Sequence, residues 1–356
     1  MELNKEKENY PELIERVFEF EVSSGQATER LDVFLTTNIR NATRNKVQRS
    51  IEEGSVTING KPAKSNKRIK AGDKIKCVLL KPPPIELVPE DIPLKIEYED
   101  DYLLVVNKPS GMVTHPAFGN RYGTLVNAVL YHLGFRETIP VKAEEDDDFA
   151  EELIFTTDLI RPGIVHRLDK ETSGLLLISK NPEIHSELAK QFAERKVEKI
   201  YRALLWGKFP KEHDIYESNI GRSKRDRKLF AVLKDEGKFA KTEYWVEKAY
   251  LYMSLVKIKL WTGRTHQIRV HFTHNNHPLV GDKQYGGDTV RFGGNNQTFK
   301  HLAMKVLNNT DGQMLHACSL EFVHPVTGEK MLIESELPDN FNTAIEKLDK
   351  FQYDFG

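Results

Sequence analysis

The chain has 356 residues, of which 39% are hydrophobic, and a formal net charge of -1. These values fit one large folded domain, or two unequal ones, with a buried core. The two cysteines, Cys77 and Cys318, form no CxxC pair, which argues against a disulfide framework or a thiolate zinc site and favours the reducing cytoplasm. The N-terminal stretch lacks the apolar core of a signal peptide, and no later stretch is long and apolar enough for a membrane span.

The near-zero total hides a segregation of charge along the chain. Residues 28–80 contain twelve lysines and arginines against five acidic residues, a balance typical of nucleic-acid-binding modules. The run AEEDDDFAEE at 143–152 has the opposite bias and predicts an acidic, solvated insertion over about 141–160. Five of the sixteen prolines lie in KPPPIELVPEDIP, which predicts an extended linker over 81–93 between two domains.

Two short helices are predicted in the basic region. Leu31, Phe34 and Leu35 follow helical spacing, and Val47 with Ile51 repeats it. Basic residues on or near the second helix can contact RNA phosphates or simply form a solvated helix face. These residues are Arg40, Arg44, Lys46 and Arg49.

The residues that follow these helices predict a β-hairpin. SVTING alternates apolar and polar residues and ends in Asn59-Gly60, a pair typical of type I′ turns, and the strand-like KIKCVLL comes later. Helices and hairpin together resemble the S4 RNA-binding domain, whose pattern RLDxxL…R…V…G.V.vNG is met from Arg30 to Gly60. The resemblance implies an S4 domain over 17–80, an αα-hairpin module that binds structured RNA.

The region beyond the linker, 94–345, predicts a second and larger domain. Strand-like stretches outnumber helix signals there, and the connections between them are short. Thr124 can cap one helix, and Asn181 followed by Pro182 can start another. We therefore expect an α+β fold around a mixed, largely antiparallel sheet.

One aspartate of this domain is a candidate nucleophile. IVHRLDKETSGLLLISK at 164–180 places Asp169 between Arg167 and Lys170, on a loop between two apolar stretches. A nearby cation favours the ionised carboxylate, which a nucleophile requires. Arg264, on the glycine-bounded turn GRTHQIRVH, could grip the same carboxylate with its guanidinium fork. The residues alone leave two interpretations open: a structural ion pair and an activated nucleophile.

Two further groups of residues have both a functional and a structural interpretation. Tyr201, on a predicted strand beside Lys199 and Arg202, can stack on a base or pack in the core. A histidine cluster lacks an accompanying HExxH or PCxxC motif, so polar or RNA-facing roles are favoured over metal binding. The cluster comprises His266, His271, His274 and His277.

Several longer motifs, taken in chain order, resemble those of the RluA-type pseudouridine synthases. They span residues 95 to 335, and together with an S4 module they are similar to the branch of the family that modifies large-subunit ribosomal RNA. The acidic insertion departs from the compact family pattern. The motifs are VVNKPSGMVTHP at 105–116, HRLDKETSGLLLISK at 166–180, KIYRALLWG at 199–207, GRTHQIRVHF at 263–272, PLVGDKQYGG at 278–287 and LHACSLEFVHPVTGE at 315–329.

The resemblance implies roles for individual residues. Asp169 stands at the place of the catalytic aspartate, Tyr201 at that of the tyrosine stacking on the target uracil, and Arg264 at that of the arginine paired with the aspartate. Arg167 matches the residue that fills the gap left by the extruded base. For the apolar wall of the pocket, the candidates are Ile268 and the strand 175–178.

The implied reaction breaks the N1–C1′ bond of uridine, turns the uracil and joins C5 to C1′. It needs no cofactor or metal, but it needs a closed pocket and an ionised carboxylate that attacks C1′ or C6 or removes a sugar proton. We expect a cytoplasmic monomer acting on 23S rRNA. Two alternatives stay open: a non-catalytic RNA-binding ribosome assembly factor, and a pseudouridine synthase acting on tRNA.

Overall fold

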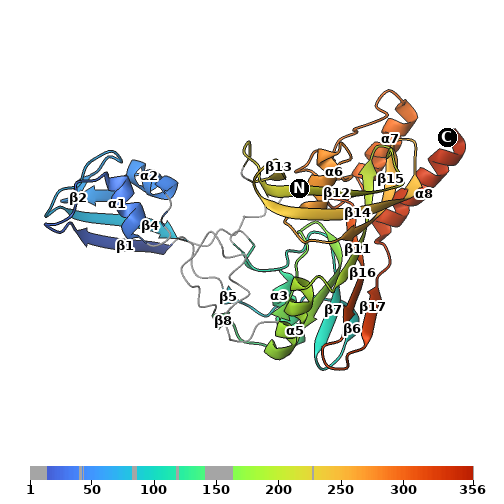
Figure 1. Cartoon of the computed structure of the whole chain (residues 1–356), viewed down its shortest axis with the longest axis horizontal. Helices are drawn as coiled ribbons and strands as arrows, with labels where there is room; N and C mark the ends of the chain where they lie inside the picture. The colour runs from blue at the N-terminus through green and yellow to red at the C-terminus, as the bar shows by residue number, and fades with distance from the viewer. Residues whose placement is uncertain are drawn as a thin grey trace, which may run out of the picture. The chain divides into compact units, whose positions relative to one another are not determined.

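A computed structural model describes residues 14–39, 42, 44–81, 86–117, 120–140, 163–226 and 228–355 (Figure 1). These residues form two compact units. The smaller is built chiefly from the described residues up to Val88, and the larger begins at Pro89. The expected acidic insertion at 141–160 and the prolines at 82–84 lie outside the described residues. Within the described ranges, no helix combines the length and apolar character that crossing a membrane requires.

The smaller unit is an antiparallel sheet, in the order β1-β4-β2-β3, that shares one apolar core with two helices (Figure 1). The predicted hairpin turn is confirmed, because Asn59 and Gly60 join β2 to β3 with φ angles of 50° and 76°, as a type I′ turn requires. The elements of this unit are β1 (Ile14–Glu21), α1 (Leu31–Asn38), α2 (Arg44–Glu52), β2 (Val56–Ile58), β3 (Lys61–Pro62), β4 (Lys74–Lys81) and the separate strand pair β5 (Glu86–Leu87) with β8 (Ile139–Pro140).

Strand β1 was not among the predicted elements. It pairs with β4 along its whole length and begins before the expected domain start at residue 17. Phe18 and Phe20 pack against the core, whereas Glu19 between them is exposed. This alternation is the usual signal for a half-buried strand, so the sequence contained the information.

An eleven-stranded sheet forms the centre of the larger unit (Figure 1). Its main path is β13-β12-β14-β15-β11-β16-β10-β7-β6, with β17 on β16 and β9 on β10. Among the described strands, only β10 and β16 pair in parallel, so the expected α+β fold with a mixed, largely antiparallel sheet is confirmed. The strands are β6 (Lys95–Glu99), β7 (Leu103–Lys108), β9 (Gly163–Ile164), β10 (Ser173–Ser179), β11 (Glu198–Trp206), β12 (His213–Arg222), β13 (Phe230–Leu233), β14 (Lys238–Ala249), β15 (Met253–Leu260), β16 (Leu315–Val323) and β17 (Lys330–Glu334).

Helices cover this sheet and bury its central strands. Helix α5 packs on β9 and β10, α6 packs on β12 to β14, and α7 contacts α8. All residues of β10 are buried, which explains why its sequence, SGLLLIS, shows no polar alternation. The helices are α3 (Leu125–His132), α5 (Pro182–Ala193), α6 (Gln267–His274), α7 (Gln297–Leu307) and α8 (Asp339–Phe355).

The predicted helix starts are confirmed by their caps. Thr124 forms a capping box with Asn127 at the start of α3. The Asn181 side chain accepts a hydrogen bond from the backbone N–H of Ile184, with Pro182 in the first turn of α5. These signals were recoverable because each depends on residues only a few positions apart.

Candidate active site

One cavity of about 400 Å³ in the larger unit collects the residues expected to be catalytic. It is formed by the loop between β9 and β10, by β11, and by the segment that leads from β15 into α6. Because these parts are far apart in the chain, only the tertiary structure brings them together. The expected site residues in its wall are Arg167, Asp169, Tyr201, Arg264 and Ile268.

The loop that carries Asp169 is fixed by its backbone. The Thr114 hydroxyl donates a hydrogen bond to the carbonyl of Leu168 at 3.0 Å. The Gly111 N–H donates to the carbonyl of Lys170 at 2.9 Å. Carbonyls on both sides of Asp169 are thus held by one neighbouring loop, so the carboxylate is presented from a well-positioned backbone.

A buried lysine lies beside this loop. Lys108 is fully buried, and its ammonium donates to the carbonyls of Pro109, Met112 and Lys170 at 2.9, 2.8 and 3.1 Å. Burial lowers the pKa of Lys108 to about 7, although the charge of Asp169 acts in the opposite direction. Lys108 was not among the expected site residues, because nothing in LLVVNK indicates that its last side chain turns inward.

The arginine paired with Asp169 is Arg269, which corrects the expected pairing with Arg264. Nη1 of Arg269 donates to Oδ2 of Asp169 at 3.2 Å. Nε of Arg264 instead donates to the backbone carbonyl of Phe239 at 3.0 Å. The physical reason is position along the helix: Arg264 precedes α6, whereas Arg269 lies in the first turn of α6 and reaches the loop.

Arg269 is itself held by buried partners. Its Nε and Nη2 donate to the two carboxylate oxygens of Asp282 at 2.7 and 2.9 Å, and Nη2 also donates to Gln284 at 2.7 Å. Burial lowers the pKa of Arg269, but the hydrogen bonds and charges of Asp282 and Asp169 outweigh burial and raise it overall. The guanidinium is therefore permanently charged and gives the Asp169 carboxylate a fixed positive partner.

A strained histidine stands next to this pair. His266 has a φ of 53°, a left-handed conformation that is uncommon for a residue with a Cβ. Its Nε2 lies 3.9 Å from Oδ2 of Asp169, and its Nδ1 lies 3.0 Å from the hydroxyl oxygen of Tyr285. Burial lowers the pKa of His266, so the ring is mainly neutral at pH 7.

Other histidines of the cluster have structural partners. His271 is hydrogen-bonded to Thr242 and Ser218 at 2.8 and 2.9 Å, and His277 stacks on Phe209 with 4.0 Å between the ring centres. In the part of the chain that the structure describes, no group of three or more His, Cys, Asp or Glu side chains is placed to hold a metal ion.

The cavity wall also contains aromatic and apolar side chains. Tyr201 and Ile268 are only 6% and 4% exposed. Burial raises the pKa of Tyr201, and the charge of Asp169 raises it further, so the phenol stays protonated. A neutral ring, an apolar wall and a carboxylate can together enclose a flat base. The strand 175–178, also expected in this wall, is buried inside the sheet instead.

In the smaller unit, two arginines converge on one buried carboxylate. Asp32 is fully buried and accepts hydrogen bonds from Arg30 at 2.9 Å, Gln48 at 2.9 Å and Arg44 at 3.2 Å. The Arg30 bond is the main reason that the pKa of Asp32 lies far below its usual range. Arg44 therefore has a structural partner, but its side chain remains 56% exposed and can also contact a phosphate.

Of the three remaining basic candidates of this unit, the structure describes the side chain of one, Arg49. Arg49 is 79% exposed and pairs with Glu53 at 2.8 Å, one helical turn away. Arg40 and the side chain of Lys46 lie outside the described residues. Contacts between RNA and this helix thus stay a prediction. Arg49 is more exposed than Arg44 and is the more accessible of the two to a phosphate.

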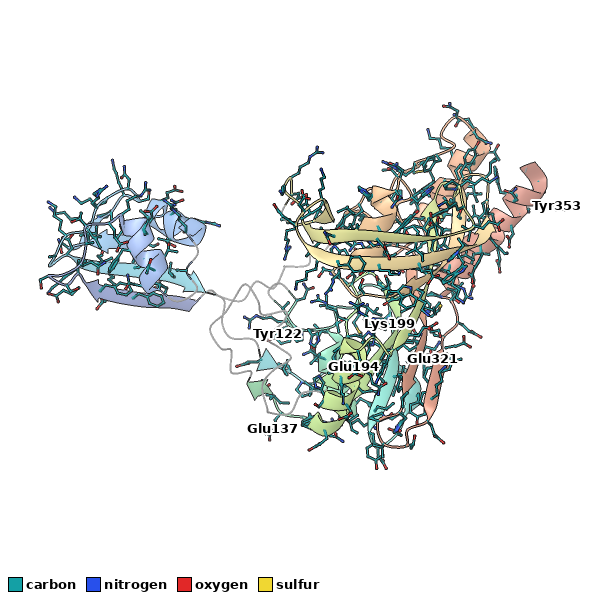
Figure 2. All side chains as sticks on the ribbon, in the orientation of Figure 1. Tyr122, Glu137, Glu194, Lys199, Glu321 and Tyr353 are labelled. Atoms are coloured by element: carbon teal, nitrogen blue, oxygen red, sulfur yellow. The ribbon has the colours of Figure 1, made fainter. Side chains whose placement is uncertain are left out.

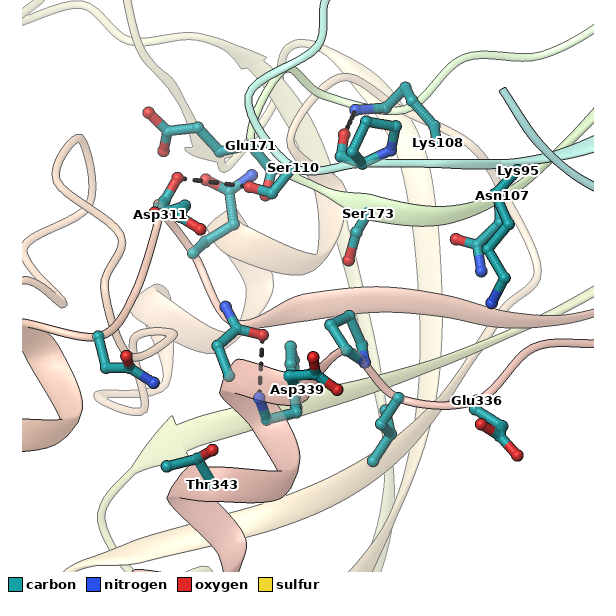
Figure 3. A pocket seen from close by; sticks show the side chains of 18 of the residues that line it. Lys95, Asn107, Lys108, Ser110, Glu171, Ser173, Asp311, Glu336, Asp339 and Thr343 are labelled. Atoms are coloured by element: carbon teal, nitrogen blue, oxygen red, sulfur yellow. Dashed lines mark hydrogen bonds between the residues drawn. The ribbon is translucent and has the colours of Figure 1, made fainter. Parts of the chain in front are cut away.

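A larger cavity of about 1030 Å³ adjoins the Asp169 loop (Figure 3). Within the described chain, none of its four acidic side chains forms an ion pair. An acidic wall repels phosphates, so this cavity is a poor site for RNA despite its size. The four residues, labelled in Figure 3, are Glu171, Asp311, Glu336 and Asp339.

Comparisons with known proteins agree with this geometry. The model of the RNA pseudouridylate synthase family matches residues 102–274, and that of the S4 domain matches residues 29–75. An uncharacterized RNA pseudouridine synthase of Chlorobaculum parvum is 46% identical, over 92% of this chain and 96% of its own. The ribosomal large subunit pseudouridine synthase D of Neisseria meningitidis serogroup A is 40% identical, over 87% of this chain and 76% of its own.

A solved structure shows the same relationship. Human RNA pseudouridylate synthase domain containing 1 is 26% identical and has a TM-score of 0.50, with 72% of this chain and 89% of the human chain covered. The chain belongs to the RNA pseudouridine synthases, the isomerases that convert uridine to pseudouridine in RNA, and it carries an S4 domain.

Proposed function

We propose that this enzyme isomerises specific uridines of 23S rRNA in the large ribosomal subunit, with Asp169 as the catalytic carboxylate. Relatives that are 36% to 40% identical and are named ribosomal large subunit pseudouridine synthase D support this RNA class. The observation that supports Asp169 is its position in the cavity wall, where it pairs with Arg269 and shares the cavity with Tyr201. We place the reaction in the cytoplasm, where the buried, unpaired Cys77 and Cys318 would stay reduced.

In the proposed reaction, the target uridine leaves its stack and enters the cavity. Tyr201 stacks on the uracil, and Ile268 bounds it. Asp169, paired with Arg269, acts at C1′ or C6 or removes a sugar proton. The N1–C1′ bond breaks, the uracil turns inside the cavity, and C5 bonds to C1′. C5 loses its proton to solvent and N1 gains one, so the product has the same atoms and the same number of electrons as the uridine.

Two arginines of the cavity are assigned to the RNA strand. Arg167 is exposed on the Asp169 loop, where it can occupy the space that the uridine leaves. Arg264 is partly exposed in the cavity wall and does not contact Asp169 directly, so a phosphate is its expected partner.

The test is tritium release from 5-tritiated uridine in unmodified 23S rRNA. We expect release by the wild type and by Lys350→Gln, a charge change on the exposed side of α8. Asp169→Asn should abolish release and keep its affinity for the rRNA, because the amide preserves size and removes only the charge. Release from tRNA transcripts but not from 23S rRNA would favour a tRNA enzyme. Binding without release from either RNA would favour the assembly factor.

A further inference from the structure

A groove of about 490 Å³ adjoins the Asp169 cavity. The groove and the cavity share six wall residues, among them Lys199 and Arg264, so they lie side by side. The groove lies between the turn from α5 into β11 and the end of β15. Figure 2 labels three residues in this region: Lys199 on β11, Glu194 after α5 and Glu321 on β16.

The groove has an excess of positive charge. Three of its cations have no carboxylate partner among the described residues. Unneutralised cations attract a polyanion such as an RNA strand. The three are Arg195, Lys199 and Arg264. The paired charges are Lys196 with Glu194 at 2.7 Å, Lys259 with Glu198, and Glu321 with Lys330 at 2.7 Å.

Arg195 occupies a backbone position where glycine would be less strained. It follows α5 with a φ of 58°. Its N–H donates to the carbonyl of Phe192, and the N–H of Lys196 donates to the carbonyl of Gln191, the two bonds of a Schellman motif. The left-handed residue of this motif is usually glycine, because a Cβ is strained there. The turn itself therefore does not require the arginine side chain.

Lys199 brings a cation to the junction between groove and cavity. It precedes Tyr201 by two positions on β11, and its Nζ lies 5.4 Å from the centre of the Phe192 ring. Burial lowers the pKa of Lys199, and no carboxylate offsets this effect. A half-buried ammonium without a counter-ion is unfavourable, and an RNA phosphate would supply the missing negative charge.

Trp261 adds a flat surface to the groove. It is 41% exposed, although its indole N–H is fixed by a 2.9 Å hydrogen bond to Glu243. The ammonium groups of Lys259 and Lys241 lie 4.9 and 5.6 Å from the ring centre. An exposed, oriented aromatic ring beside cations is the usual platform for an unpaired base.

We propose that this groove binds the RNA strand next to the target uridine, with Lys199 and Arg195 on its phosphates and Trp261 stacked on a neighbouring base. The inference rests on the proposed function and deepens it, because the strand of an extruded uridine has to pass the mouth of the cavity. Phosphate contacts combined with base stacking select an unpaired segment over a duplex. The groove would therefore restrict the enzyme to uridines in loops and single strands.

Arg195→Gly gives the cleanest test, because glycine relieves the backbone strain. We expect unchanged or higher thermal stability, weaker binding of a 23S rRNA fragment that contains the target, and a shallower dependence of log Kd on log salt. The slope should fall by about 0.7 for one lost phosphate contact on a single strand. Lys350→Gln removes one charge from α8 and should keep the wild-type slope. Equal slopes for Arg195→Gly and the wild type would overturn the contact.

Lys199 is tested by changing the RNA together with the protein. Short RNAs carrying the mapped target uridine are made with one neutral methylphosphonate at a time. At one position next to the target, the neutral linkage should weaken binding to the wild type but have no further effect on Lys199→Gln. If every position weakens both proteins equally, Lys199 does not contact a phosphate.

Stacking on Trp261 is tested with Trp261→Phe and Trp261→Ala. Alanine should raise KM about tenfold and leave kcat nearly unchanged, while phenylalanine retains most of the affinity. An abasic nucleotide at the stacked position should remove the difference between the wild type and Trp261→Ala. Equal KM values for all three proteins would exclude stacking. Tritium release by the wild type shows which proposal has failed. If the wild type releases no tritium, the proposed function is contradicted. If it releases tritium but the variants behave like the wild type, only the groove proposal is contradicted.

Discussion

Nη1 of Arg269 lies 3.2 Å from Oδ2 of Asp169, although 100 positions separate them in the chain. The same guanidinium donates to both carboxylate oxygens of Asp282, which is fully buried, whereas the Asp169 side chain is 23% exposed. One arginine therefore bridges an inaccessible carboxylate that fixes its position and an accessible one that can react. This arrangement gives Asp169 a permanent counter-charge without enclosing it.

Arg269→Lys tests this bridge. An ammonium cannot form the paired bonds to Asp282 while also reaching Asp169, so the reactive carboxylate loses its oriented partner. We expect kcat to fall by about 10²–10³-fold with little change in the affinity for rRNA. Arg264→Gln should instead raise KM and keep kcat. Single-turnover tritium release and filter binding measure both quantities, and the reverse pattern would restore Arg264 as the partner of Asp169.

The same substitution should lower the free energy of unfolding. Asp282 would stay buried with incomplete pairing, which costs about 3 kcal/mol. Urea unfolding of Arg269→Lys measures this loss, and the kinetic comparison has to be made well below its unfolding temperature. An unchanged free energy of unfolding would mean that lysine replaces all the bonds of the arginine.

Lys108 predicts a pH dependence of stability. Its pKa is lowered from 10.5 to about 7 in the folded protein, so between these values the unfolded chain binds more protons. The free energy of unfolding then rises with pH, by at most about 1.4 kcal/mol per pH unit. This contribution is lost as the pH falls through 7.

Lys108→Met removes the titrating group. Compared with the wild type, it should lose stability because the carbonyls of Pro109, Met112 and Lys170 lose their donor. As the pH rises from 7 to 9, the free energy of unfolding of the wild type should increase relative to that of Lys108→Met. Urea unfolding at several pH values measures it. A constant difference would contradict the low pKa.

A substitution at Gly312 should disturb the Asp169 loop, although Gly312 lies far from this loop in the sequence. Its φ is +132°, and a Cβ added there would lie 2.5 Å from the Cβ of Glu171, which belongs to that loop. Gly312→Ala should therefore lower kcat as well as stability. Gly328→Ala is the matched control, because Gly328 also has a positive φ, +73°, but nothing lies within 4 Å.

The two glycine variants separate the effect of backbone strain from the effect of displacing Glu171. Both should lose about 1–2 kcal/mol for the left-handed backbone, and only Gly312→Ala should lose more through the clash. Thermal unfolding and single-turnover release measure the two effects. Equal kcat values for both variants would show that Glu171 can move without disturbing Asp169.

Salt dependence tests the RNA face of the smaller unit. Arg49→Gln should reduce the slope of log K against log salt by about 0.9 if Arg49 contacts a duplex phosphate. Its stability should hardly change, because the exposed pair with Glu53 contributes little. Arg44→Gln should lower both the slope and the stability, since it also removes a bond to Asp32. Unchanged slopes in both variants would exclude phosphate contacts by Arg44 and Arg49.

Much of the fold could be predicted because its signals are local. The Asn59-Gly60 turn, the Thr124 capping box and the Asn181 cap each depend on a few neighbouring residues. Strand β1 was overlooked although Phe18 and Phe20 alternate with exposed residues. The motif order likewise indicated which family the chain belongs to, and the comparisons confirm it.

Most element types, the fold class, the family and the candidate residues could be inferred from the order of amino acids, because turns, caps, alternation and motifs are properties of short segments. Which side chains meet depends on the fold. Arg264 and Arg269 lie in the same motif, and the start of α6 between them turns Arg269 toward Asp169. Burial of Lys108 beside the loop was equally invisible in the sequence, because the inward direction of a side chain depends on packing between segments far apart in the chain.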